Sequence, residues 1–289
     1  MKVAALSQAP REDRVYRAMT DDGAFRVVTA RTTDTVRAAI EAQKAGRAGP
    51  AFADLLTGAI LMRETMSPDL RVQVIMQSTD HKCSMVADAH PDGSTRDLLR
   101  TSEDGTFPTA KTLLQIARSV HNGGLLQGVV EIPSSGDISG ALMTYMQTSE
   151  QVVSMISVGA VFAKDQLVEA GGYIVQLLPE VGRGPLMVMT ERLRDFERVA
   201  ELLQKGEGDP VHLASEILYG MPFSPVGDSS VRFGCNCSDE RILASLASLS
   251  KADIQELYSR GEVLEMMCDY CRKEYRVEPA RLKGLLATS

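Results

Sequence analysis

The chain has 289 residues, 44% of them hydrophobic, and a formal net charge of −7 at pH 7. This length and apolar content can bury a sizeable core in about one to three domains. Residues 232–289 contain nine Lys or Arg and nine Asp or Glu, so they lack the basic excess with which nucleic-acid modules neutralise phosphates. We therefore expect no nucleic-acid partner.

The sequence predicts neither secretion nor a membrane span. Behind Lys2 only residues 3–6 form an apolar run, which is too short for a secretory signal. The longest weakly polar run, residues 155–163, has about half of the ~20 apolar residues that a spanning helix needs. We therefore expect a cytoplasmic protein with no membrane partner. Clustered cysteines in that compartment indicate metal binding or redox chemistry rather than structural disulfides.

The first region, residues 1–185, mixes strand and helix patterns. Short apolar or alternating runs predict strands at 24–30, 70–77, 127–132 and 171–178. Three-to-four-residue periodicity predicts helices at 33–46, 50–65 and 139–156, the last with Leu142, Met146 and Val153 on its apolar side. Because strands and helices alternate without a regular βαβ repeat, we predict an α+β fold.

The second region, residues 186–232, is helical and charged. One apolar stripe recurs at three- and four-residue steps: Met189, Leu193, Phe196, Ala200 and Leu203. Ten of the twenty residues from 190 to 209 are charged. Asp209 and Pro210 then predict the start of a second short helix. This region is either a solvated connector or a helical linker that is stable only while its neighbours hold it.

The third region, residues 233–289, has helix patterns at 239–249 and 251–261 but too few large apolar residues for a core. Segments of this size usually need a metal or a disulfide to stay folded. Four of the five cysteines lie here, as the pairs Cys235/Cys237 and Cys268/Cys271 in a CxC…CxxC arrangement. The sequence therefore predicts a small zinc-binding domain at the C-terminal end.

Four thiolates can complete a closed tetrahedral zinc shell, which leaves no open position for catalysis. The histidines that catalytic zinc sites commonly use all lie outside this segment: His81, His90, His121 and His212. The simplest interpretation is a constitutive structural zinc knot for assembly or nucleic-acid contact. The tight CxC spacing favours a second interpretation, an oxidant-sensitive fold, because a released CxC pair could close a small disulfide. Zinc thiolates remain oxidisable, and loss of the metal would unfold the segment.

The sequence "FGCNCSDERILASLASLS…CDYCRKEY" resembles the zinc-binding redox-switch domain of the heat-shock protein 33 family. The resemblance extends to "QGVVE" at 127–131, "YMQTSEQ" at 145–151 and "AGGYIVQLLPE" at 170–180. The stretch "IPSSGDISGALMTY" departs from the family pattern, and the first hundred residues match it only loosely.

The resemblance implies a redox-regulated, ATP-independent holdase that binds unfolded or partially folded client proteins under oxidative and heat stress. Residues 1–185 would be the chaperone core domain, 186–232 the linker and 233–289 the redox-switch domain. Cys235, Cys237, Cys268 and Cys271 would bind one zinc per chain in the reduced, inactive form. Oxidation would pair Cys235 with Cys237 and Cys268 with Cys271, release the zinc and permit a homodimer.

No other motif competes with this interpretation. The chain lacks GxxxxGK[ST], HExxH, GxSxG and GxGxxG sequences, so we predict no enzyme and no nucleotide cofactor. Cys83 is expected to begin a strand as a buried hydrophobic residue rather than to bind metal. Met143, Met146 and Met155 are candidates for an adaptable binding surface, although methionines at helical spacing are more often core residues.

Overall fold

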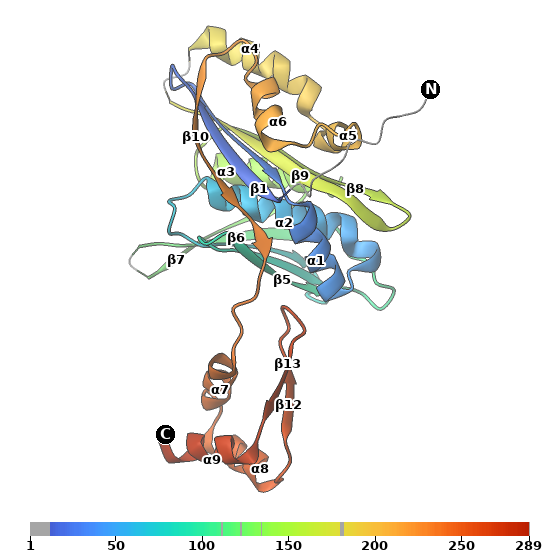
Figure 1. Ribbon diagram of the computed structural model, residues 1–289, viewed down its shortest axis with the longest axis vertical. Coiled ribbons are helices and arrows are strands. Elements are labelled where there is room, and N and C mark those ends of the chain that lie inside the picture. Colours follow the sequence, from blue (N-terminus) through green and yellow to red (C-terminus); the bar gives the residue numbers. More distant parts are fainter. Residues whose placement is uncertain (1–11, 111, 122, 134, 180–181, 289) are drawn as a thin grey trace. The chain divides into compact units, whose positions relative to one another are not determined.

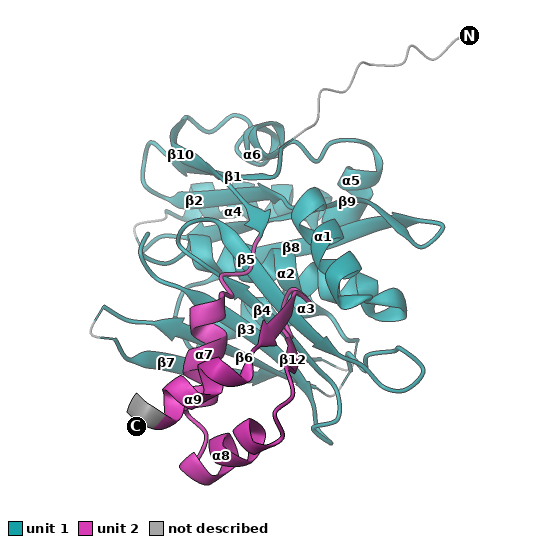
Figure 2. Ribbon diagram, turned by 60° about the horizontal axis from the view of Figure 1, so that its bottom comes forward, with its two compact units in different colours: residues 1–233 teal, residues 234–289 magenta. Residues whose placement is uncertain are grey.

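The computed structural model describes residues 12–110, 112–121, 123–133, 135–179 and 182–288. The prediction that the chain has no secretory signal was based on residues 3–6, which lie outside these ranges. The chain divides into two compact units, residues 1–233 and 234–289 (Figure 2). Among the described residues, no helix is both long and apolar enough to cross a bilayer. Each unit combines helices with β-sheet, which confirms the predicted α+β class.

The first unit contains two sheets. The five-stranded sheet has the order β10 (Phe223–Ser230), β1 (Arg14–Thr20), β2 (Phe25–Arg31), β9 (Gln166–Leu177), β8 (Ser154–Ala163). The six-stranded sheet has the order β11 (Arg232–Phe233), β5 (Ser94–Arg100), β4 (Ser84–Ala89), β3 (Val72–Ser78), β6 (Thr112–Ser119), β7 (Leu125–Glu131). Among the strands of the described residues, β11 and β5 form the one parallel pair. The predicted strands in this unit are confirmed as β2, β3, β7 and β9.

Helices α1 (Thr33–Gln43), α2 (Gly49–Glu64) and α3 (Ile138–Thr148) lie between the two sheets (Figure 1). A short 3-10 turn, η1 (Gly46–Ala48), joins the first two. The main core surrounds α2, whose Leu55, Leu56 and Leu61 are at most 1% exposed. A Cβ on Gly58 would lie 2.7 Å from a Leu142 methyl carbon, so the missing side chain lets α2 approach α3 closely.

The predicted helix at 139–156 is too long. The helix α3 ends at Thr148, and strand β8 begins at Ser154. Between them Gln151 has a φ of 59°, a left-handed conformation that interrupts a right-handed helix. The sequence that follows is rich in valine and isoleucine, whose branched side chains favour a strand. Pairing with the five-stranded sheet makes this segment strand β8. Sequence periodicity alone could not reveal that pairing.

Helices α4 (Arg183–Leu193), α5 (Val199–Gln204) and α6 (Pro210–Ile217) cover the other face of the five-stranded sheet (Figure 1). They contain most of the predicted linker and belong to the first unit. The predicted apolar stripe does not lie on one helix, because the 3-10 turn η2 (Arg194–Phe196) separates α4 from α5. The predicted start of α6 is confirmed: the Asp209 side chain accepts a hydrogen bond from the His212 N–H at 3.0 Å.

After α6 the chain passes from one sheet to the other. Strand β10 pairs with β1, and β11 then pairs with β5. The crossing is held by the Val231 N–H, which donates to the Asp13 carbonyl at 3.2 Å, and by the Arg232 N–H, which donates to the Gly93 carbonyl at 3.0 Å. Gly93 has a φ of +77°, and a Cβ there would lie 2.3 Å from the Ser230 carbonyl oxygen. Only glycine fits this crossing without displacing the chain.

The second unit contains α7 (Asp239–Ala247), α8 (Lys251–Ser259), the hairpin β12 (Leu264–Met267) and β13 (Glu274–Val277), and α9 (Pro279–Thr288). The helices predicted at 239–249 and 251–261 are confirmed as α7 and α8. The core of this unit centres on three buried side chains, Leu246, Val277 and Leu282. Such a small cluster agrees with the expectation that apolar burial alone cannot hold the segment together.

Asp97 in β5 yields a prediction about stability. It is 0% exposed, and neither carboxylate oxygen has a hydrogen-bond partner among the described residues. Burial raises its pKa from 3.8 to about 8. Because this pKa is higher in the folded state, ionisation opposes folding: the cost is absent below about pH 4, grows as the pH rises and is complete above about pH 8.

We expect Asp97→Asn to stabilise the protein by about 1 kcal/mol or more at pH 8 and by less at pH 5. Thermal unfolding followed by circular dichroism at both values would measure this. The matched control is Asp228→Asn, which changes an exposed carboxylate and should leave the midpoint nearly constant. A gain for Asp97→Asn that is the same at both pH values would contradict the assignment.

Candidate metal centre

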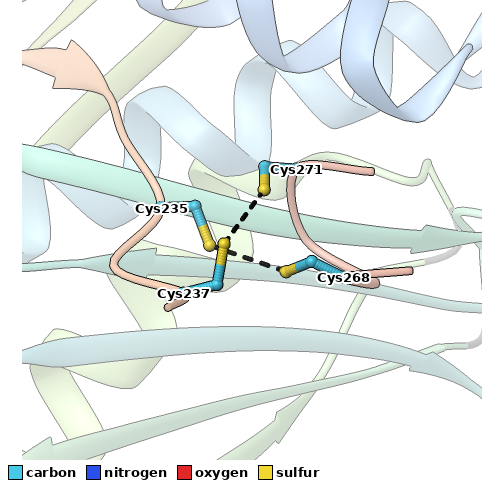
Figure 3. A group of neighbouring side chains, drawn as sticks. All are labelled: Cys235, Cys237, Cys268 and Cys271. Carbon is cyan, nitrogen blue, oxygen red and sulfur yellow. Dashed lines mark hydrogen bonds between the residues drawn. The ribbon is translucent and has the colours of Figure 1, made fainter. Parts of the chain in front are cut away.

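Four cysteines of the second unit meet at one point (Figure 3). Cys235 and Cys237 lie in the segment that precedes α7, and Cys268 and Cys271 lie in the connection between β12 and β13. The structure thus brings together all four residues that the sequence predicted as a group. All four are free thiols.

The distances between sulfur atoms suit a tetrahedral metal ion. The Sγ atoms of Cys235 and Cys268 are 3.7 Å apart, and those of Cys237 and Cys271 are 3.4 Å apart. All four sulfur atoms lie within 4.8 Å of one another. Zinc–sulfur bonds of ~2.3 Å in a regular tetrahedron place neighbouring sulfur atoms about 3.8 Å apart. The four cysteines could therefore hold a metal ion, and four thiolates are a donor set compatible with zinc.

Backbone hydrogen bonds shape the loop that carries Cys268 and Cys271. The Cys268 N–H donates to the Lys273 carbonyl at 2.9 Å, and the Arg272 N–H donates to the Cys268 carbonyl at 2.8 Å. Arg272 has a φ of 60°, so the chain turns back tightly after the second cysteine. These bonds direct both thiols toward the same point.

The helix α7 fixes the other pair. Ser238 directly follows Cys237 and caps this helix, because its side chain accepts a hydrogen bond from the Arg241 N–H at 3.3 Å. Asp239 and Glu240 occupy the first turn, where the helix dipole favours negative charge. The "CSDER" sequence therefore has a structural reason: it starts a helix immediately after the second thiol.

Tyr275 is a site residue that the sequence analysis missed. Its hydroxyl donates a hydrogen bond to Cys237 Sγ at 2.8 Å, and the residue is 4% exposed. The Lys273 ammonium lies over the Tyr275 ring, 5.1 Å from its centroid. Alternation in β13 was the available signal, since Tyr275 and Val277 are the two buried positions of that strand.

The thiols differ in acidity. Burial raises the pKa of Cys235 to about 12, and hydrogen bonds with neighbouring thiols add to the rise. Burial also acts to raise the pKa of Cys237, but hydrogen bonds from Tyr275 and from the other thiols outweigh it and lower that pKa to about 7. Burial raises the pKa of Cys271. A metal ion must therefore displace protons from Cys235 and Cys271, so its affinity should increase with pH.

The other candidates from the sequence lie in the first unit. Cys83 is 5% exposed, packs in the main core and directly precedes β4, as predicted. The methionine candidates are distributed between two clusters. Met146 is 2% exposed and Met143 packs beside it in the main core, whereas Met155 packs against the cluster beneath α4, α5 and α6. Met143 and Met155 nevertheless line one pocket of the first unit, together with Val158 and Val199, whereas the buried Met146 is not part of its lining.

Comparisons with known proteins agree on one family. A family model described as Hsp33 protein matches residues 13–278. A 33 kDa chaperonin from Syntrophotalea carbinolica is 27% identical, over 96% of this chain and 100% of that protein. The 33 kDa chaperonin of Bacillus subtilis is 28% identical, over 94% and 98% of the two chains.

The crystal structure of the 33 kDa chaperonin (heat shock protein 33 homolog) from Thermotoga maritima superposes with a TM-score of 0.83. It covers 96% of this chain and 98% of that one at 19% sequence identity. A likeness at this identity establishes a shared fold.

A cluster of four thiolates gives a direct prediction for metal content. Purified under reducing conditions, the protein should contain one zinc per chain, and Cys268→Ser should weaken binding strongly because a closed shell loses a ligand. Cys83→Ser is the matched control, since it removes a buried thiol from the other unit. Atomic absorption and a chelator competition would measure both. Full zinc occupancy in a Cys268→Ser, Cys271→Ser double variant would exclude these ligands.

Proposed function

This chain belongs to the Hsp33 family and is a chaperone, and we propose that it is an ATP-independent holdase that oxidation switches on. In the proposed cycle the reduced protein holds one zinc and is inactive. Oxidised protein binds unfolded or partially folded clients during oxidative and heat stress. The convergence of Cys235, Cys237, Cys268 and Cys271 in a unit with little core is the observation that carries the proposal.

The four cysteines would act as ligands and as the redox centre. When bound, zinc supplies the cross-link between the segment before α7 and the β12–β13 loop. We propose that oxidation pairs Cys235 with Cys237 and Cys268 with Cys271. In each pair one sulfur attacks a peroxide oxygen to give a sulfenic acid, and the second sulfur displaces that oxygen as water. Two thiolates, one hydrogen peroxide and two protons thus give one disulfide and two water molecules.

Loss of the thiolate ligands would remove the main support of the second unit. In small metal domains the free energy of metal binding is largely free energy of folding. The residual cluster around Leu246, Val277 and Leu282 is small. We therefore propose that residues 233–289 unfold on oxidation, which turns a chemical change into a conformational one.

Residues 1–185 would be the chaperone core and residues 186–232 a releasable cover. Helices α4, α5 and α6 bury a set of apolar side chains on the five-stranded sheet: Ala18, Phe25, Val27, Tyr173 and Val175. Apolar burial contributes little to the docking of α4, since only Met189 and Leu193 are buried in it while Met187 is 72% exposed. The Arg192 guanidinium adds hydrogen bonds to the carbonyls of Ile217 and Tyr219. Release of these helices would expose a contiguous apolar face, the kind of surface that unfolding proteins bind.

Family membership also supports a homodimer in the oxidised form and a cytoplasmic location, both of which remain proposals. The sequence motifs of nucleotide-dependent enzymes are absent, so no ATP-driven step is proposed.

The switch is tested by comparing redox states. Protein treated with peroxide at heat-shock temperature should suppress the aggregation of a thermally unfolding client without ATP, measured by light scattering, whereas reduced protein should not. Hydrogen exchange in residues 183–288 should rise with activity. Cys83→Ser should behave like the natural sequence. Equal activity in both states would defeat the switch and favour a constitutive zinc knot.

Polar contacts of the cover give a second prediction. The Tyr173 hydroxyl donates to the Phe196 carbonyl at 2.9 Å, at the turn between α4 and α5. Tyr173→Phe leaves that carbonyl without its donor, which costs the docked cover about 1–3 kcal/mol. Hydrogen exchange in residues 183–204 of the reduced protein should therefore increase, with partial holdase activity on heating.

Tyr16→Phe is the matched control for this test. Tyr16 packs against the same cluster. Its hydroxyl has no hydrogen-bond partner among the described residues, so Tyr16→Phe should change the hydrogen exchange of residues 183–204 very little. If residues 183–204 exchange as slowly in both variants as in the natural chain, the Tyr173 contact does not hold the cover.

A further inference from the structure

Each of three sulfur atoms in the metal centre has its own hydrogen-bond donor. The backbone N–H of Cys237 serves Cys235, and the backbone N–H of Lys273 serves Cys271. Cys237 differs, because its donor is the Tyr275 side chain at 2.8 Å. Tyr275 is thus a donor that a side-chain substitution can remove while the loop backbone stays intact.

We propose that Tyr275 is a positioning residue that protects Cys237 from electrophiles and thereby sets the oxidant dose at which the metal centre opens. This inference rests on the proposed redox switch for its physiological meaning. Its chemical content, the selective protection of one sulfur, concerns the cluster itself.

The protection follows from how sulfur reacts. An oxidant or alkylating agent is attacked by a sulfur lone pair, and a hydrogen bond draws electron density from that sulfur and occupies the direction of approach. The O–H···S bond must weaken before Cys237 can react. Removing a contact of this size should change a rate by about threefold to tenfold, because a net hydrogen bond contributes roughly one power of ten at most.

The surroundings hold Tyr275 in the donating position. Its ring is 4% exposed, on the buried side of β13, with Val277 two residues further along the same side. The Lys273 ammonium lies over the ring at 5.1 Å from the centroid. The hydroxyl is therefore fixed by packing and by a cation–π contact, both of which survive when phenylalanine replaces tyrosine.

Limited alkylation of the reduced, zinc-loaded full-length chain tests the proposal. Iodoacetamide is added far below one equivalent, so that doubly labelled chains are rare, and trypsin then yields the peptides 233–241 and 261–272. Each peptide carries one cysteine pair, and tandem mass spectrometry assigns the label to one sulfur within it. The natural chain is compared with Tyr275→Phe and with the control Tyr258→Phe, which changes a partly buried tyrosine of the same unit.

The natural chain sets the reference ratio of Cys237 to Cys235 labelling, because both sulfur atoms have a hydrogen-bond donor. In Tyr275→Phe the ratio of Cys237 to Cys235 labelling should rise about threefold to tenfold, and peroxide should release zinc correspondingly faster. The ratio should stay constant in Tyr258→Phe. A merely structural role would raise labelling at all four sulfurs together and leave the ratio unchanged.

An unchanged ratio in Tyr275→Phe overturns the proposal. Lys273→Ala removes the ammonium that lies over the Tyr275 ring and keeps the loop backbone, so it should raise the same ratio by a smaller factor. If Tyr275→Phe fails to fold, an unchanged ratio in Lys273→Ala overturns the proposal. Neither readout depends on holdase activity. Selective protection of Cys237 without any redox-dependent activity would refute the proposed function alone. Redox-dependent activity without selective protection of Cys237 would refute this inference alone.

Discussion

The second unit depends on one constraint: it must hold four sulfur atoms within metal-binding distance because it has little else to keep it folded. Its buried core is centred on Leu246, Val277 and Leu282. Two short segments carry the thiols, and each is shaped by a neighbouring element, the capped start of α7 and the turn after Cys271. In the proposed switch the same atoms would be both the chemical sensor and the structural support, so a change in sulfur chemistry would also be a change in folding.

The first unit solves a different problem. Its main core around α2 lies between two sheets and is closed to solvent, while the second apolar cluster is closed only by α4, α5 and α6. Covering a sheet face with short, highly charged helices gives a cover of low local stability over a scaffold of high stability. The proposed holdase activity would need this combination, because the client-binding face must be covered in the inactive form and still be releasable.

The sequence predicted what depends on local pattern and composition. The α+β class, strands β2, β3, β7 and β9, helices α1 and α2, the cap at Asp209 and the grouping of four cysteines all follow from periodicity or spacing, and the structure confirms them. The helix predicted at 139–156 ran into the start of β8, at residues 154–156, because valine and methionine fit either pattern. The pairing partner β9 decides between them. The break between α4 and α5 depends on Ser157 and Tyr173, which bond the turn from distant strands. Tyr275 could not be recognised without the hairpin register that points it at Cys237.

The crossing at residues 231–233 separates the second unit from the cover along the chain. Val231 is 6% exposed and its N–H donates to the Asp13 carbonyl. The Arg232 N–H donates to the Gly93 carbonyl, and the Arg232 guanidinium pairs with Asp92 at 2.9 Å. Unfolding that starts at the cysteines therefore meets a pinned segment before it reaches β10 and α6. In the proposed switch, oxidation supplies the first input, and thermal opening of this crossing supplies the second. The two inputs would act in series, so the proposed switch would respond to both stresses together and to neither alone.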